Sequence, residues 1–239
     1  MTIRQIKGKR KGIIIMDDPI FHIEDTDYTD HVPFRKLWAV ISIDPGATGA
    51  VAIQFERSDT PAVRDTPVTK IVTKKKNKKK PVPGKKFKKF SSKTKTEYDD
   101  TAMNELIVSM VTFAKSKGYQ IHICIEKVHA MAKMRSNPKT GQNEKVTQGA
   151  VSSFNFGAGF GVWRGIMAAT RLPRTFVTPQ AWKKTQLAGK SKEKDQSRIR
   201  AIELWPKLHE VLKRKMDVDR ADALLIGRHV LNELIGQNT

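Results

Sequence analysis

Four acidic residues stand at positions where carboxylates can do chemistry. Asp44 follows an apolar run and precedes a Pro-Gly pair, and Glu126 follows a second apolar run. Asp219 and Asp222 are three residues apart, so a helix would place both on one face. A carboxylate at the end of a buried strand is costly unless something pairs with it. We therefore expect these four acids to gather around cations.

Clusters built only from carboxylates suit hard cations such as Mg²⁺ or Mn²⁺. Without cations, four such charges in one place cannot all stay ionised. Two ions about 4 Å apart are a common arrangement for phosphodiester hydrolysis, in which one ion activates water and the other stabilises the leaving oxygen. The acids therefore predict hydrolysis by water at a site with two Mg²⁺ ions, with Mn²⁺ as the alternative cation.

Simpler explanations exist for each acid. Asp44 before Pro-Gly can be a turn former, Asp219 can cap its helix, and a neighbouring acid such as Asp217 can be plain surface. The run from Asp44 to Ala50 also resembles the first phosphate loop of actin-like ATPases, but no second glycine-rich loop accompanies it. Cys124 lies inside an apolar run, and the histidines lack metal-ligand spacing, so no other nucleophile or metal motif is supported.

The composition favours a nucleic-acid partner. The 239 residues carry a formal charge of +21, and basic side chains displace counterions from phosphates. A lone cysteine forms no intrachain disulfide, which fits a reducing compartment. No apolar stretch of about 18 residues predicts a membrane span. The N-terminus has no secretory signal pattern.

Apolar patterns predict the elements that must position the acids. A strand, tight turn and strand over 37–43 and 50–55 form a hairpin that ends the first strand at Asp44. Further strands are expected at 121–125 and 174–178, and a loop at 131–147. Helices are expected at 99–117, 148–170, 179–186, 192–204 and 219–234. This order predicts a mixed α/β domain with helices on a central sheet.

Two segments lie outside this pattern. Residues 1–36 show no sustained period and are an extension of unknown role. Residues 70–95 contain 13 lysines and no acid, and we expect a loop or irregular hairpin that binds phosphates; a solvated loop or a nuclear-import signal are the alternatives. The lysines expected to bind DNA are Lys74, Lys75, Lys76, Lys78, Lys79 and Lys80.

Small residues recur every four positions in the segment 148–170, namely Ser153, Gly157, Gly161, Gly165 and Ala169. Each glycine inside a helix costs about 1 kcal/mol relative to alanine. Something is therefore expected to pack closely against this stripe, whether the sheet, a second subunit or DNA.

Five motifs in order resemble the RuvC-type Holliday-junction resolvases of bacteria and phages, in the ribonuclease H-like superfamily. They are Ile43-Asp44-Pro45-Gly46-x-x-Gly49, Ile125-Glu126, the helix Gln148 to Ala169, Pro179-x-x-Trp182-Lys183 and Asp219-x-x-Asp222-Ala223-Leu224. The resemblance covers roughly residues 37–236. It implies an α/β domain of ribonuclease H-like fold, with a central mixed sheet whose first strands are antiparallel and whose later strands are parallel. It also implies a homodimeric endonuclease that resolves four-way junctions or related branched DNA in the cytoplasm of a bacterium or of a phage-infected cell. It places the metal-binding and catalytic carboxylates on Asp44, Glu126, Asp219 and Asp222.

The same resemblance places phosphate-positioning lysines on Lys183, as a catalytic residue, and on Lys194. The sequence departs from the family at His129, where an aromatic residue is common. This histidine can stack on DNA or be an ordinary loop residue. The long lysine-rich insertion is a second departure, and it favours broader binding of branched DNA. A non-catalytic nucleic-acid-binding protein of the same fold is the alternative function.

Overall fold

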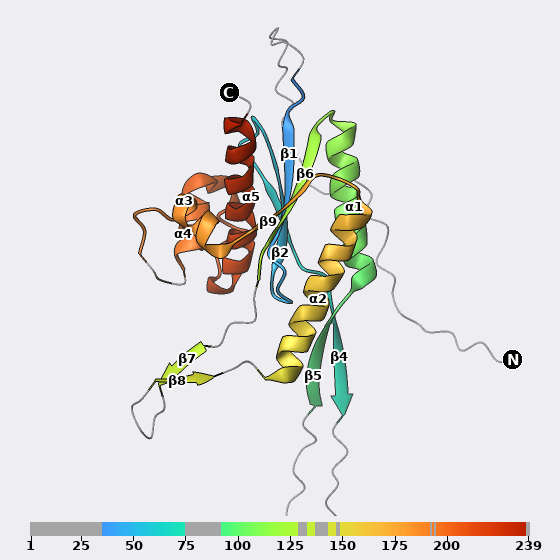
Figure 1. Cartoon of the computed structure of the whole chain (residues 1–239), viewed down its shortest axis with the longest axis vertical. Coiled ribbons are helices and arrows are strands. Elements are labelled where there is room, and N and C mark those ends of the chain that lie inside the picture. Colours follow the sequence, from blue (N-terminus) through green and yellow to red (C-terminus); the bar gives the residue numbers. More distant parts are fainter. Residues whose placement is uncertain are drawn as a thin grey trace, which may run out of the picture. The chain divides into compact units, whose positions relative to one another are not determined.

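The computed structural model describes residues 35–74, 92–128, 133–136, 143–146, 149–191, 193 and 195–237. They all belong to one structural unit (Figure 1). Its strands are β1 (Trp38–Ile43), β2 (Ala50–Phe55), β3 (Ala62–Asp65), β4 (Val68–Lys74), β5 (Ser92–Tyr98), β6 (Gln120–Glu126), β7 (Lys133–Ser136), β8 (Asn143–Val146) and β9 (Arg174–Val177). Its α-helices are α1 (Asp100–Ser116), α2 (Ala150–Ala169), α3 (Pro179–Gln186), α4 (Gln196–Leu204) and α5 (Val218–Gly236), with single 3-10 turns at Pro206–Leu208 and Lys215–Asp217.

The central sheet has five strands in the order β3-β2-β1-β6-β9. The pairs β1/β2 and β2/β3 are antiparallel, whereas β1/β6 and β6/β9 are parallel. This arrangement confirms the predicted fold class, an α/β domain of ribonuclease H-like type with antiparallel first strands and parallel later ones. Strand β3 was not predicted from the sequence.

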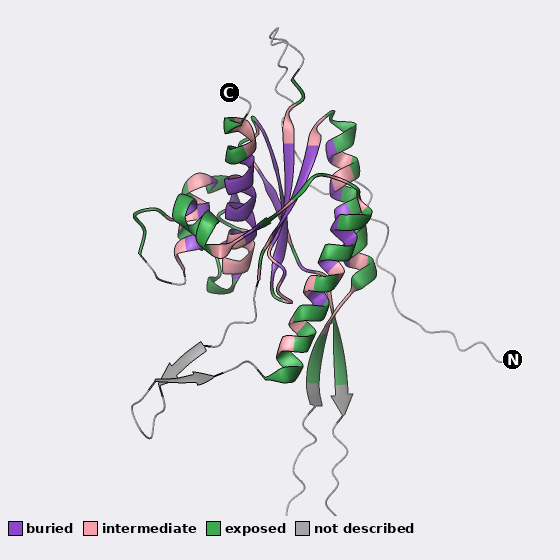
Figure 2. Ribbon diagram, viewed as in Figure 1, coloured by how far each residue is buried: buried purple, intermediate pink, exposed green. Residues whose placement is uncertain are grey.

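Helices cover both faces of the sheet: α3, α4 and α5 lie on one side, and α1 and α2 on the other (Figure 1). Val40 and Ser42 of β1 face α5, because Val40 joins the α5 core cluster and Ser42 bonds to the α5 backbone. On the opposite face, Phe55 of β2 meets Phe113 of α1 edge to face, with ring centroids 5.9 Å apart. The sheet is therefore buried on both sides, as Figure 2 shows.

The segment 131–147 corrects one expectation. Its described residues form β7 and β8, which pair antiparallel from Lys133↔Val146 to Ser136↔Asn143. Both strands are rich in polar residues and pair only with each other in the described part of the chain. No apolar alternation therefore marked them as strands in the sequence.

The lysine-rich insertion begins and ends in an antiparallel ribbon. Strands β4 and β5 pair from Val68↔Tyr98 to Lys74↔Ser92. Lys74 ends β4. The expected DNA-binding residues Lys75, Lys76, Lys78, Lys79 and Lys80 lie outside the described residues. The insertion is thus carried on a two-stranded base that is separate from the central sheet.

The glycine stripe of α2 is not where this chain packs closely. A Cβ added to Gly157, Gly161 or Gly165 would meet nothing within 4 Å among the described residues. Gly159 is the close approach instead, because a Cβ there would lie 2.2 Å from the Tyr98 ring. The expectation of packing against the sheet is therefore wrong for the stripe. Among the described helices, none is long and apolar enough to cross a membrane.

Candidate active site

Asp44 and Glu126 lie at the carboxyl ends of two neighbouring parallel strands. In the β1/β6 ladder Ser42 is paired with Cys124 and Ile43 with Ile125, so the next residue along each strand is an acid. Alternation along a strand puts Asp44 on the same face as Ser42, and Glu126 on the same face as Cys124. Both carboxylates therefore emerge on the side of the sheet that α5 covers.

A tight turn fixes the backbone of Asp44. Its N–H donates to the carbonyl of Ala50 over 2.9 Å, and the N–H of Gly49 donates to the carbonyl of Gly46 over 2.9 Å. A Cβ on Gly49 would lie only 2.2 Å from the Asp44 carbonyl oxygen, so only glycine fits there. The Asp-Pro-Gly-x-x-Gly segment thus folds back on itself and holds Asp44 at the start of the turn.

Helix α5 brings the other two acids to this edge. The Ser42 hydroxyl donates to the Ala223 carbonyl over 2.7 Å, and the Gln54 side-chain amide donates to the Leu224 carbonyl. Helix and sheet approach closely here, because a Cβ on Gly227 would lie 2.6 Å from the Ser42 oxygen. These contacts dock the first turns of α5, with Asp219 and Asp222, beside β1.

Asp217 corrects two of the simpler explanations. It is buried rather than plain surface, and it precedes α5 as the N-cap residue, which Asp219 does not. Its carboxylate accepts hydrogen bonds from the Arg214 side chain, the shortest of 2.6 Å, and lies 3.5 Å from Arg220. These partners keep the pKa of Asp217 low despite its burial. Asp217 is therefore a structural acid with cationic partners of its own.

The four predicted acids influence one another electrostatically. Burial raises the pKa of Asp44 well above its usual value, and the charges of Asp222, Glu126 and Asp219 raise it further. Glu126, Asp219 and Asp222 thus all lie within electrostatic reach of Asp44. The mutual repulsion is the kind that bound cations neutralise.

Asp222 shows the same effect with two opposing contacts. Burial raises its pKa to about 6, against a hydrogen bond from Ser197 and the positive charge of Lys183, which lower it. Its Oδ1 atom is buried without a hydrogen-bond partner among the described residues. A buried carboxylate oxygen without a partner is expensive unless a ligand or ion meets it.

These observations fit a hard divalent cation, since the donors are carboxylates and one buried oxygen is free. In the described part of the chain, however, no three His, Cys, Asp or Glu side chains already stand in an arrangement that could hold an ion. The described acids therefore do not form a finished coordination shell in this structure.

Trp182 and Lys183 of α3 border the acids. The buried Trp182 indole N–H donates to Glu126 Oε1 over 2.8 Å. The Lys183 ammonium lies 5.0 Å from the centre of the Trp182 ring and is exposed. The structure therefore places the predicted phosphate-positioning lysine beside the acids. The predicted DNA contacts Lys194 and His129 lie outside the described residues.

Three residues near the acids were missed by the sequence analysis. Trp182 stood in a quoted motif, and a buried indole N–H usually needs a partner, so a signal existed. Ser197 gave none, because its bond to Asp222 depends on how α4 docks. Tyr98 gave none either: its hydroxyl lies 3.4 Å from the Pro45 carbonyl oxygen, and burial and then the charge of Asp44 raise its pKa.

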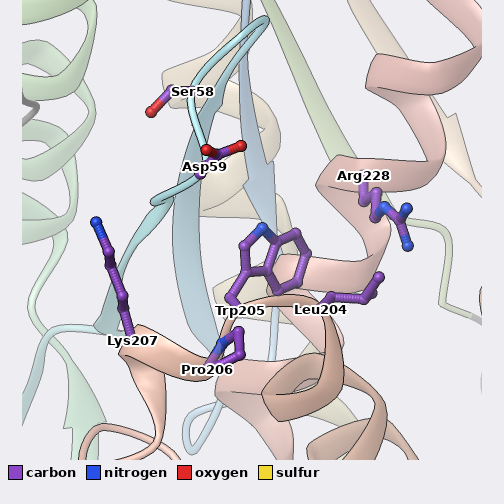
Figure 3. Close-up of a pocket in the computed structure, with 7 residues that line it drawn as sticks. All are labelled: Ser58, Asp59, Leu204, Trp205, Pro206, Lys207 and Arg228. Atoms are coloured by element: carbon purple, nitrogen blue, oxygen red, sulfur yellow. The ribbon is translucent and has the colours of Figure 1, made fainter.

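A separate pocket lies elsewhere on the unit and contains none of the four acids. Figure 3 shows Trp205 at its centre, with Lys207 and Arg228 on opposite sides. The remaining lining residues are Ser58, Asp59, Leu204 and Pro206. The acids therefore form a site distinct from this pocket.

No protein-family model matches the chain, and no curated protein matches it. Among solved structures, the chain is similar to RuvC of Thermus thermophilus. It shares 13% identity with the free structure, with a TM-score of 0.38, over 83% of this chain and 96% of that chain. It shares 12% identity with RuvC in complex with a Holliday junction substrate, with a TM-score of 0.42 and the same two coverages.

Proposed function

We propose that this protein is a metal-dependent endonuclease that hydrolyses phosphodiester bonds in branched DNA, with the four-way junction as its substrate. The observation that carries the proposal is the meeting of four carboxylates from β1, β6 and α5 at one edge of the sheet. Each of the other three raises the pKa of Asp44, so the cluster is built at an electrostatic cost that bound cations would offset.

Asp44, Glu126, Asp219 and Asp222 would hold Mg²⁺ or Mn²⁺. When bound, such ions supply an activated water and stabilise the leaving oxygen of a phosphodiester. The chain's own side chains would position the phosphate. Lys183 is exposed, and its positive charge lowers the pKa of Asp222, so it can neutralise a phosphate that binds beside the acids.

The chain's charge of +21 supports a polyanionic substrate. The proposal extends to a homodimer, because symmetric cuts in a four-way junction need two active sites related by a two-fold axis. The outer face of α2 is the proposed contact surface. No described residue lies within 4 Å of a Cβ at Gly157, Gly161 or Gly165, and Val151 and Phe154 beside this stripe are each 75% exposed.

The test is cleavage of a synthetic four-way junction, compared with a linear duplex and a splayed fork, in Mg²⁺ and then in EDTA. Paired symmetric nicks in the junction, abolished by EDTA, are expected. Metal-dependent cutting of forks as well would broaden the substrate to branched DNA in general. Tight junction binding without any cutting would overturn the proposal of an enzyme and favour a non-catalytic DNA-binding protein.

Asp44→Asn tests the site itself. It should keep junction binding and abolish cleavage, because it removes one charge from the cluster with almost no change in shape. Asp59→Asn is the matched control, since Asp59 is an exposed acid away from the cluster. A variant at Asp44 that cuts as fast as the wild type would remove Asp44 from the site.

A further inference from the structure

The contact between Trp182 and Glu126 is more than packing. Trp182 has no exposed surface, and its Nε1–H donates over 2.8 Å to one oxygen of a carboxylate. Hydrogen bonds to charged acceptors are stronger than neutral ones and are directional. The indole therefore restricts the rotation of the Glu126 side chain.

The structure around Trp182 is built to hold it in this place. Strand β9 pairs with β6 as far as Glu126↔Val177, and α3 starts directly afterwards, with Thr178 capping it through a 3.3 Å bond from the Ala181 N–H. The Lys127 N–H donates to the Val177 carbonyl over 2.6 Å. The segment that carries Trp182 is thus hydrogen-bonded to β6, the strand that carries Glu126.

The other end of α3 is fixed to α5. Thr185 Oγ1 lies 2.9 Å from His229 Nδ1. Because α5 also carries Asp219 and Asp222, the helix that holds Glu126 is joined to the helix that supplies two of the other acids. A displacement of α3 would therefore affect the positions of both Glu126 and helix α5.

We propose that Trp182 is a positioning residue for the metal site. Its indole N–H takes Oε1 of Glu126 and leaves the second oxygen for a cation, while its ring face carries Lys183 at 5.0 Å. One side chain thus contacts both a carboxylate and an ammonium group of the proposed site. This inference rests on the proposed function, because it assigns Trp182 a role in that same site.

Trp163 supplies a matched control. It is as completely buried as Trp182, but its Nε1 has no hydrogen-bond partner among the described residues. Trp182→Phe and Trp163→Phe thus make the same change in volume, and only the first removes a donor from a carboxylate.

The experiment is titration of the full-length variants with Mn²⁺ alone, by calorimetry, without DNA. Removal of a partner that orients a metal ligand typically weakens metal binding by about 10- to 100-fold. We expect a decrease of about that size for Trp182→Phe and wild-type affinity for Trp163→Phe. Equal Mn²⁺ affinity in wild type and Trp182→Phe would overturn the proposal.

A double-mutant cycle separates positioning from general damage. In a Glu126→Ala background the indole has no carboxylate to hold, so adding Trp182→Phe should cost no further Mn²⁺ affinity. An additive decrease would show that Trp182 acts only on the fold, and the positioning role would fail.

A second measurement leaves Trp182 unchanged, in case its replacement prevents folding. In ¹⁵N-labelled wild type, Mg²⁺ should shift the indole N–H resonance of Trp182, which is assigned by elimination with Phe variants of Trp38, Trp163 and Trp205. An unmoved resonance in a protein that binds Mg²⁺ would also overturn the proposal. If the wild type neither binds metal nor cuts DNA, the proposed function itself has failed.

Discussion

The hydroxyl of Ser42 on β1 donates a 2.7 Å hydrogen bond to the carbonyl oxygen of Ala223 on α5. Ser42 stands two residues before Asp44, and Ala223 directly follows Asp222. One buried polar contact therefore fixes the separation between two elements that carry the acids. The geometry of the proposed site depends on this helix-to-sheet contact as much as on the acids.

Gly227→Ala should disturb this contact. The added Cβ would lie 2.6 Å from the Ser42 oxygen and 2.8 Å from the Gln54 amide nitrogen. Overpacking of this kind typically costs about 1–3 kcal/mol, and we expect a decrease of that size in the free energy of unfolding, measured by urea denaturation. Junction cleavage should fall too, because α5 must move away from β1.

Gly236→Ala is the control for this prediction, on the same helix. Among the described residues, nothing lies within 4 Å of the added Cβ. The variant should be as stable as the wild type, or more stable by up to about 1 kcal/mol from helix propensity. Equal stability of the two variants would mean that α5 can shift away from β1 at little cost.

Stability without metal should fall as the pH rises. The pKa of Asp222 is about 6 in the folded chain against an ordinary value of 3.8, so between these values the folded state binds more protons than the unfolded one. The free energy of unfolding therefore decreases with rising pH across this window, by about 1–3 kcal/mol. Asp44 contributes in the same direction.

Urea denaturation in EDTA at about pH 5 and about pH 8 measures this pH effect. Asp222→Asn should reduce it and should be more stable than the wild type at the higher pH. Added Mg²⁺ should restore the stability of the wild type at the higher pH. The test is the free energy of unfolding of the wild type minus that of Asp222→Asn. A difference that increases from the lower to the higher pH would contradict the prediction.

Gly159→Ala should displace Tyr98, since the new Cβ would lie 2.2 Å from its ring. Tyr98 joins the base of the lysine-rich ribbon to the turn after Asp44, through its 3.4 Å contact with the Pro45 carbonyl. We expect lower thermal stability and a changed tyrosine absorbance spectrum. Gly157→Ala, whose new Cβ has no described residue within 4 Å, should leave the tyrosine spectrum unchanged and should not lower thermal stability.

The α2 face gives a prediction about assembly. Gly161→Leu should leave the stability of the single chain nearly unchanged, because no described residue lies within 4 Å of a Cβ at that position. It should block close approach of a second copy, so sedimentation analysis should show a monomer for Gly161→Leu and, if the proposed interface is right, a dimer for the wild type. A dimer that persists in Gly161→Leu would place the interface elsewhere.

The lysine tract is predicted to bind phosphates. Replacing Lys74, Lys75, Lys76, Lys78, Lys79 and Lys80 by Gln should weaken junction binding and reduce its salt dependence, by up to about 0.9 in log–log slope for each phosphate that is no longer neutralised. Mn²⁺ affinity without DNA should not change. Arg at the same positions should keep the slope; an unchanged slope in the Gln variant would make the tract a bystander.

The acids were predictable because their signal is local. Asp44 and Glu126 end apolar runs, and the pairing of two parallel strands then puts them side by side without further information. Asp219 and Asp222 needed only helical spacing. What the sequence could not provide was the docking of α5, which depends on the Ser42 hydroxyl finding a helix carbonyl far away in the chain.

The misses have a common cause. Strand β3 has four residues, too few for a period, and is held by its pairing with β2. Strands β7 and β8 lack an apolar face, so only their mutual pairing defines them. Ser197 reaches Asp222 through the tertiary placement of α4. In each case the element or contact is defined by its partner in another segment, and such pairing leaves no periodic pattern in the sequence.

The pairing of Val68 with Tyr98 has a consequence for how such a protein can change. The chain leaves the domain and returns to it at adjacent points, so residues can be added or deleted between them without altering the spacing of anything that follows. The insertion is therefore interchangeable: its length and charge can evolve, or be engineered, while the sheet edge with the carboxylates stays intact. Under the proposed function, DNA binding by the insertion and hydrolysis at the carboxylates could then be changed independently.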